Sequence, residues 1–152
     1  YGARSMLIDA RGQRPFIAYA PVQGDKTRET VEEIYRELKD IVGARPATQE
    51  ELDKIQKNEI LGLPGSWETI AAVSRSLAEI VTYDLPDSYY QSYPEKVRKL
   101  KLADISAAAA KTLHPDQLVW IVVGDRASVE PALKELGWGT IQVIDTDGQP
   151  VQ

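Results

Sequence analysis

The sequence contains no cysteine and a single histidine, His114, among its 152 residues. Without cysteine the chain can form neither a disulfide bond nor a thiolate metal site, and this absence is compatible with the cytosol as well as with an oxidising compartment. The helix motifs H-E-x-x-H and H-x-x-E-H each need two histidines, so neither can exist here. His114 stands in Leu113-His114-Pro115-Asp116, where we interpret it as a surface residue that closes a helix end.

Positive charge is also in short supply. The chain has 18 lysines and arginines against 23 acidic residues, and its net charge is -5. A nucleic-acid partner usually requires a basic face, so we expect none. No apolar run approaches the roughly 20 residues of a membrane span. Glycine-rich phosphate loops are missing too, because Gly62-Leu63-Pro64-Gly65 has too few glycines and predicts a helix break.

Length and composition are those of one globular domain, with 43% hydrophobic and 27% charged residues. We expect residues 1–145 to form this single domain and residues 146–152 to form a polar tail. The first residue is Tyr1, and no basic segment followed by an apolar core comes after it. The chain is therefore expected to begin inside a larger parent protein.

The stretch 15–43 combines a short strand, 16–20, with the longest amphipathic helix of the sequence. Asp25 or Thr27 is expected to cap the start of this helix, and Gly43 to end it in a left-handed conformation. The apolar residues of the helix recur at helical spacing and predict a face packed on a sheet: Val31, Ile34, Tyr35, Leu38, Ile41 and Val42.

Further helices are predicted from caps and breaks. Thr48-Gln49-Glu50-Glu51 has the pattern of a capping box and predicts the start of a second helix. Ser66 is expected to cap a third helix and Asp87 to begin a fourth. Pro94 should kink the fourth helix or restart it, because proline removes a backbone donor. Residues 103–113 predict an alanine-rich fifth helix.

The strands lie toward the two ends of the sequence. Residues 5–10 and 16–20 precede the helices, whereas 118–123 and 140–144 follow them, with a short helix predicted at 128–136. The run 118–123 is apolar throughout, which is typical of a strand covered on both faces or at the centre of a sheet. This order predicts an α+β fold with a mainly antiparallel sheet and helices packed on one face.

No self-sufficient active site can be assembled from these residues. The acidic pairs Glu32-Glu33 and Glu50-Glu51 are interpreted as solvated carboxylates on helix surfaces. A Ser-His-Asp triad would have to use the single histidine, and no G-x-S-x-G motif accompanies it. Four tyrosines fit a buried helix face better than a binding platform: Tyr83, Tyr89, Tyr90 and Tyr93.

Four blocks, in order along nearly the whole chain, carry a family resemblance. They are Tyr1-Gly2-Ala3, the stretch 15–27 (PFIAYAPVQGDKT), the stretch 63–69 (LPGSWET) and the stretch 113–126 (LHPDQLVWIVVGDR). Together they resemble the metal-free C-terminal half-domain of the pitrilysin/insulinase family of zinc metallopeptidases, the inverzincins. The resemblance implies the α+β half-domain fold of that family, as in the subunits of the mitochondrial processing peptidase.

The resemblance also implies a division of roles. In the family, a half with the H-x-x-E-H motif holds the zinc, and the metal-free half completes a chamber around an extended peptide substrate. This chain would then be inactive alone, hold no cofactor and need a catalytic half-domain or subunit as its partner. Tyr1 matches the family tyrosine that contacts the substrate, whereas Arg4 does not match its arginine companion, which would lie upstream.

Two other functions stay open on the sequence. One is a non-proteolytic scaffold subunit, as in the core proteins of a respiratory complex, which resemble the same family. The other is a small-molecule-binding domain, for which no motif was found. The family is often bacterial, which favours the periplasm over the cytoplasm, although the residues do not determine the compartment.

Overall fold

A computed structural model describes residues 2–151, and 55% of the chain is helical. Two strands come first and six α-helices follow, with three short 3₁₀ turns between them. Their bounds are β1 Arg4–Leu7, β2 Phe16–Tyr19, α1 Thr27–Ile41, α2 Gln49–Gly62, α3 Ile70–Thr82, α4 Tyr89–Lys99, α5 Leu102–Thr112 and α6 Arg126–Lys134, and the 3₁₀ turns span Gly24–Lys26, Pro64–Trp67 and Pro115–Gln117.

The predicted α+β fold with a mainly antiparallel sheet is wrong. The described residues form one two-stranded ribbon, in which β1 and β2 pair antiparallel with Arg4 opposite Tyr19 and Leu7 opposite Phe16. Among the described residues, the stretches 118–123 and 140–144 join no sheet, and the second makes only an isolated antiparallel bridge, between its last residue, Ile144, and Pro150. A segment with a strand-like sequence forms a strand only when a neighbouring backbone pairs with it. The apolar pattern of these two stretches does not by itself provide such a neighbour.

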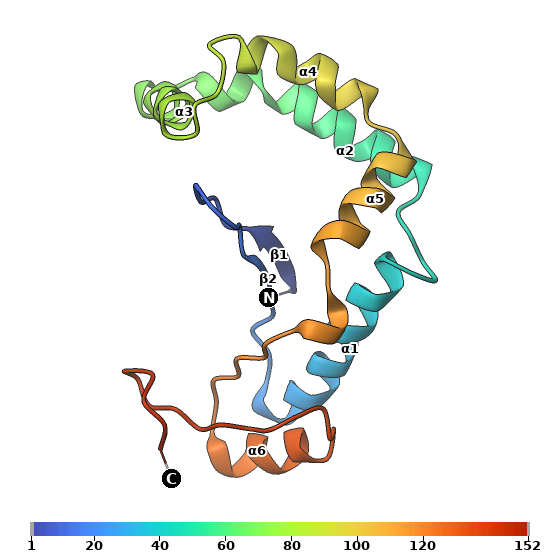
Figure 1. The fold of residues 1–152 in the computed structure, drawn as a ribbon, viewed down its shortest axis with the longest axis vertical. Coiled ribbons are helices and arrows are strands. Elements are labelled where there is room, and N and C mark those ends of the chain that lie inside the picture. The colour runs from blue at the N-terminus through green and yellow to red at the C-terminus, as the bar shows by residue number, and fades with distance from the viewer. Residues whose placement is uncertain (1, 152) are drawn as a thin grey trace.

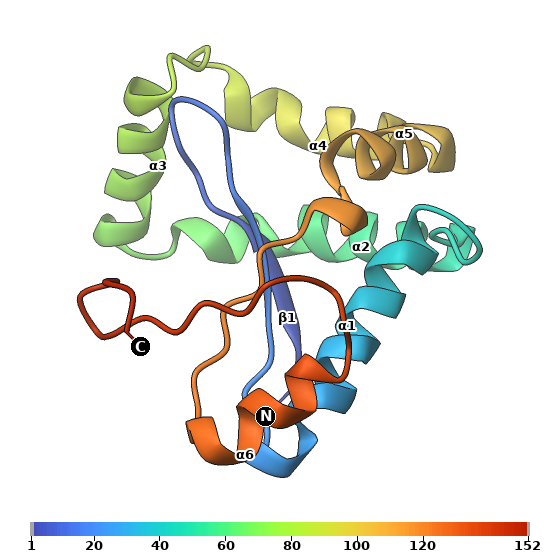
Figure 2. The same ribbon diagram turned by 60° about the horizontal axis from the view of Figure 1, so that its bottom comes forward.

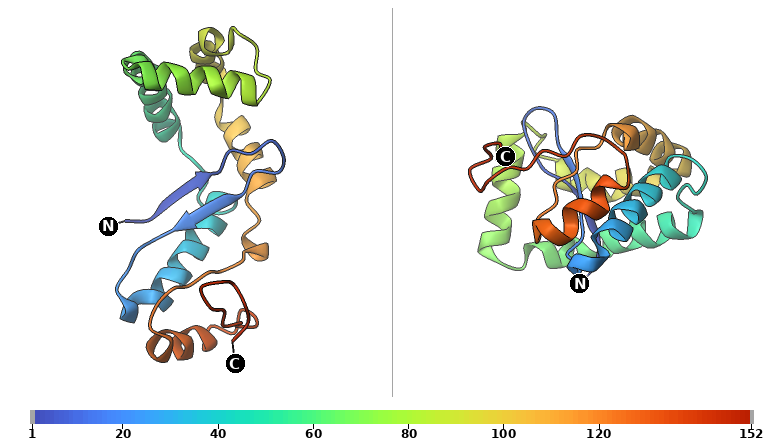
Figure 3. Two further views of the ribbon diagram at one scale, coloured as in Figure 1. Left: turned by 90° about the vertical axis from the view of Figure 1, so that its left-hand side faces the viewer. Right: turned by 90° about the horizontal axis from the view of Figure 1, so that it is seen from below.

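The helices are arranged as an open arc (Figure 1). The helix α3 lies at one end of the arc and α6 at the other, with α4, α2, α5 and α1 between them. The β1–β2 hairpin lies within the curve, and its tip reaches toward α3 (Figure 2). Arg11 in that tip donates a 2.8 Å hydrogen bond to the carbonyl of Thr82 at the end of α3. The two ends of the arc stay apart in the side view as well (Figure 3).

The helix predictions hold better than the sheet. Thr48 caps α2 in the predicted capping box, with its hydroxyl accepting from the Glu51 N–H and the Glu51 carboxylate accepting from the Thr48 N–H. Several details are wrong. Neither Asp25 nor Thr27 caps α1, because its N-cap residue is Lys26 and no side chain makes the capping hydrogen bond. The cap of α3 is Thr69 rather than Ser66, which lies in the preceding 3₁₀ turn. The helix α4 does not restart at Pro94 but continues through it, and Gly43 does not take a left-handed conformation.

Little of the chain is buried. The buried apolar side chains among the described residues are Val31, Leu52, Val97 and Val129, each from a different helix. They belong to two contacts, one between α2 and α4 and the other between α1 and α6. The accessible surface is 11916 Å², whereas a compact monomer of 16.9 kDa is expected to expose about 7,700 Å². The arc therefore leaves uncovered a large surface that a compact domain would bury.

Candidate functional site

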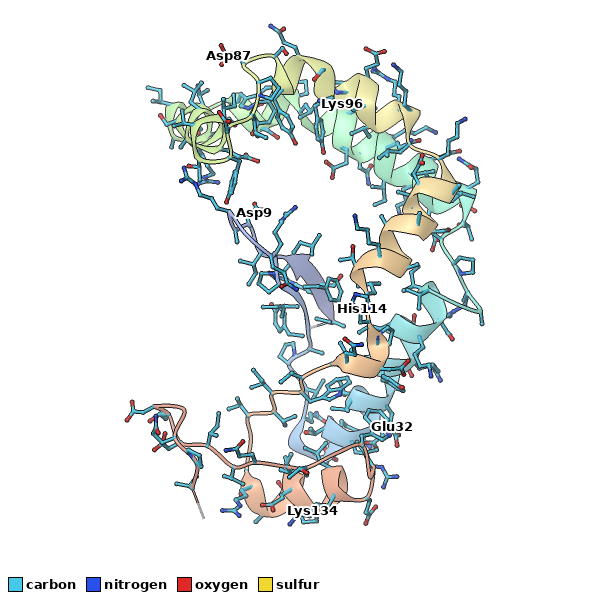
Figure 4. All side chains as sticks on the ribbon, viewed as in Figure 1. Asp9, Glu32, Asp87, Lys96, His114 and Lys134 are labelled. Carbon is cyan, nitrogen blue, oxygen red and sulfur yellow. The ribbon has the colours of Figure 1, made fainter. Side chains whose placement is uncertain are left out.

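Tyr1, the substrate-contacting residue implied by the resemblance, lies outside the described residues 2–151. His114 is exposed and lies two residues beyond the end of α5, where the sequence placed it (Figure 4). Within the described range, no three His, Cys, Asp or Glu side chains gather closely enough to hold a metal ion. None of the helices in that range is both long enough and apolar enough to cross a membrane.

The tyrosines of α4 form a structural cluster with α2 and α3. The phenol of Tyr90 donates a 2.6 Å hydrogen bond to Glu79, and that of Tyr93 donates a 2.9 Å hydrogen bond to Glu59. Burial, and then the neighbouring carboxylate, raises the pKa of both phenols, that of Tyr93 to about 12. The rings of Tyr90 and Trp67 pack edge to face at 5.2 Å. The two phenols therefore join helices and are neutral at physiological pH. The tyrosines are half-buried, however, whereas the sequence predicted a buried face.

A hollow of about 670 Å³ lies along α6 and is lined largely by charged side chains. Its central carboxylate, Glu130, accepts from Arg126 at 2.6 Å and from Lys134 at 2.7 Å. These two hydrogen bonds, that of Lys134 first, lower the pKa of Glu130 to about 2. Glu130 is therefore ionised at neutral pH and lacks the raised pKa that a general acid needs there.

A second, smaller hollow of about 200 Å³ lies where the hairpin meets α1 and the 3₁₀ turn after α5. Phe16, Leu38 and Leu118 supply apolar walls, and Arg14 and His114 line it as well. Arg14 is already paired with Asp9. The volume is below the roughly 300–1,000 Å³ of a small-molecule site, so this hollow has the size for one side chain rather than for a substrate.

The segment 118–123 has no regular secondary structure, and its Trp120 packs against another aromatic ring. Trp120 lies 6.0 Å from Trp138, and Trp138 in turn lies 4.7 Å from Tyr35 of α1, measured between ring centroids. The alternate residues face solvent, with Val119, Ile121 and Val123 exposed to 87%, 81% and 95%. The sequence-based interpretation of a strand covered on both faces or at the centre of a sheet is therefore wrong, because the segment joins no sheet and one of its faces is open.

The backbone of the same segment is open as well. No backbone–backbone hydrogen bond joins residues 118–124 to any other described residue. Buried peptide groups are nearly always paired, and a row of unpaired ones on a Val- and Ile-rich segment is a template for strand pairing. We refer to residues 118–123 as the open segment.

A second exposed apolar surface lies on α3, at the far end of the arc. Ile70, Leu77 and Val81 are largely exposed and share one side of the helix, while Ser76 and Glu79 face Trp67 and Tyr90. Monomeric proteins rarely expose contiguous apolar patches of this kind without a binding role. The uncovered surfaces are thus distributed between the open segment and α3.

Comparison with known proteins adds no relative: no family model matches the sequence, and neither a curated protein nor a solved structure matches it.

Proposed function

We propose that this chain is a non-catalytic domain of a zinc metalloendopeptidase, which completes the chamber of the enzyme and helps to hold an extended peptide. The observation that carries the proposal is the uncovered apolar surface of the arc. A chain that exposes about 1.5 times the surface of a compact monomer of its mass needs further protein, from its own parent chain or from a subunit, to cover it. The family resemblance of the four sequence blocks supports a half-domain with the H-x-x-E-H motif as this partner.

The surplus of about 4,200 Å² on this chain alone exceeds the roughly 1,000–2,500 Å² that each partner contributes to most permanent interfaces, so it favours a permanent partner over a passing one. Permanent interfaces bury roughly 2,000–5,000 Å² in total and are rich in apolar side chains. The exposed residues Ile70, Val81, Ile121 and Val123 have that character. With four small buried side chains as its core, the isolated chain has little to oppose its conformational entropy.

In this proposal the zinc belongs to the catalytic partner, and Tyr1 acts on the substrate. A phenol O–H placed near the scissile carbonyl donates to the oxygen as negative charge develops there, beside the metal. The titratable groups of α4 and α6 described above are committed to helix contacts, so they are assigned no chemical role.

The proposal is tested on the protein as its own organism assembles it. The chain is tagged, purified with its stoichiometric partner, and assayed for zinc and for peptide cleavage. We expect a partner that contains H-x-x-E-H, about one zinc per complex and cleavage that a chelator abolishes. A stoichiometric partner without the motif, and a complex without zinc, would instead establish the scaffold function.

Tyr1→Phe then tests the assigned residue within that complex. Loss of one donor to the developing oxyanion lowers kcat by about 10²-fold, with little change in KM. Tyr19→Phe is the matched control, because Tyr19 is an exposed residue of β2. Equal turnover in both variants would remove Tyr1 from the site.

A further inference from the structure

We infer that the arc is hinged and that Arg11, at the tip of the β1–β2 hairpin, holds its two halves at a fixed separation. The relationship that carries the inference is the hydrogen bond from Arg11 to the carbonyl of Thr82, the last residue of α3, at the open side of the arc (Figure 1). The inference concerns a conformational device of this chain and does not depend on the proposed function.

The extensive contacts between elements divide the helices into two groups. The α1 group comprises α1, α6 and the 3₁₀ turns Gly24–Lys26 and Pro115–Gln117, and the α2 group comprises α2, α3, α4 and the 3₁₀ turn Pro64–Trp67. Among the described residues, no element of one group packs extensively on an element of the other, and α5 packs extensively on neither. Packed helices move together, whereas parts without a large shared interface move relative to each other. A change in the opening of the arc therefore breaks no packed interface.

Two connections of the chain join the groups, and both lie at the back of the arc, on the right of Figure 1. In the linker between α1 and α2, Arg45 is tied to the end of α1 by a 2.8 Å backbone hydrogen bond, and Thr48 caps α2, so residues 46–47 are left between the two anchors. The other connection is α5, which follows α4 through two residues of extended backbone, 100–101. A few residues at the ends of elements are sufficient for a hinge.

The hairpin spans the open side of the arc, away from these hinges. Its base lies with the α1 group, because Phe16 lines the smaller hollow together with Leu38 of α1. At its tip, the Nε–H of Arg11 donates a 2.8 Å hydrogen bond to the carbonyl of Thr82. The last carbonyls of a helix have no partners within it and carry partial negative charge, which favours a cation there.

This hydrogen bond has no support from others. In the part of the chain that the structure describes, it is the single hydrogen bond or ion pair between the hairpin and the α2 group. A hydrogen bond from a charged donor shifts an equilibrium by about tenfold or more. Because no packed interface opposes the motion, a shift of that size is enough to change how widely the arc opens.

Distance measurements by double electron–electron resonance test the inference on the full 152-residue chain. The chain has no cysteine, so two introduced cysteines carry the spin labels without other changes. Ser74→Cys on α3 with Ala127→Cys on α6 reports the separation of the two ends of the arc, and Ser74→Cys with Lys57→Cys on α2 reports distances within the α2 group. All three positions are exposed.

Arg11→Gln should broaden the end-to-end distance distribution, because it lowers the ratio of bonded to released hairpin tips by about tenfold. Arg4→Gln, at an exposed arginine of β1 in the same hairpin, is the matched control and should leave the distribution unchanged. Arg11→Lys keeps a charged donor and should restore part of the narrow distribution. The distances within the α2 group should stay the same in every variant, which also shows that the helices remain folded.

Pro46→Gly examines the hinge itself. Glycine gives the linker more backbone freedom than proline, so this substitution should broaden the end-to-end distribution further when it is combined with Arg11→Gln. Equal end-to-end distributions in the native chain and in Arg11→Gln would overturn the role of Arg11. Broadening within the α2 group in Arg11→Gln, or no added effect of Pro46→Gly, would overturn the hinge between two rigid groups.

Discussion

The phenol oxygen of Tyr93 on α4 lies 2.9 Å from a carboxylate oxygen of Glu59 on α2 and donates a hydrogen bond to it. The same two helices are joined by Gln56, whose side-chain amide donates to the carbonyls of Val97 at 2.7 Å and Leu100 at 3.0 Å. Those carbonyls lie at the end of α4, where a helix has no partners of its own. The α2–α4 pair is therefore held by side-chain hydrogen bonds, two of which satisfy carbonyls at the end of α4.

The Tyr93 hydrogen bond predicts a loss of stability at high pH. Burial and the Glu59 carboxylate raise the pKa of Tyr93 from its ordinary 10 to about 12. The folded chain then keeps a proton that the unfolded chain releases, so this contribution to stability is complete below pH 10 and is lost between pH 10 and about 12. The urea concentration at the unfolding midpoint should therefore fall between pH 10 and about 12. Tyr93→Phe should make this fall smaller, whereas Tyr19→Phe should not change it.

The capping box of α2 gives a local prediction. Thr48→Ala removes the hydroxyl that accepts from the Glu51 N–H and should destabilise the helix by about 1 kcal/mol. The amides of the first turn of α2 should exchange faster as a result. Thr48→Ser keeps the hydroxyl and serves as the control; equal exchange rates in the alanine and serine variants would contradict the role given to the cap.

The buried side chain of Leu52 should matter more than the exposed one of its neighbour. Leu52 is 7% exposed and Ile55 is 56% exposed on the same helix. Leu52→Ala should lower the free energy of unfolding by about 2–3 kcal/mol, because it leaves a cavity, and Ile55→Ala by much less. Hydrogen exchange in α2 and α4 measures the difference; similar losses from both substitutions would show that this contact does not form the core.

The ion pairs of Glu130 predict a loss of stability in acid. Its pKa is lowered from an ordinary 4.5 to about 2 by hydrogen bonds from Lys134 and Arg126. The unfolded chain therefore binds a proton before the folded one does, and this contribution is present above pH 4.5 and disappears as the pH falls toward 2. Hydrogen exchange of the α6 amides should therefore show a loss of local stability as the pH falls. Glu130→Gln should make this loss smaller, and Lys134→Gln should reduce it in part.

The sequence predicted local structure more successfully than assembly. Helical periodicity and the Thr48 cap depend on residues a few positions apart, so α1 and α2 could be placed from the pattern alone. Pairing of strands depends on segments far apart in the chain. The apolar run 118–123 carried a strand signal but no information on its neighbours, and the sheet expected from it does not form.

The exposed apolar surfaces of residues 118–123 and α3 could not be predicted from the sequence. The alternation of covered and exposed residues in 118–123 is hidden because both sets are apolar. The ring contacts of Trp120 with Trp138, and of Trp138 with Tyr35, join three distant elements and have no signal in residue spacing. The α3 residues Ile70, Leu77 and Val81 recur at helical spacing, which is typical of a packed face, but they are largely exposed.

The central claim is that another polypeptide covers the apolar surface of this arc. Carbene footprinting with mass spectrometry tests it most directly, by comparing the isolated chain with the complex purified from its own organism. We predict strong labelling of Ile70, Val119 and Ile121 in the isolated chain and protection of all three in the complex, with buried Val129 unlabelled in both. Equal labelling of Ile70, Val119 and Ile121 in the two samples would contradict the account.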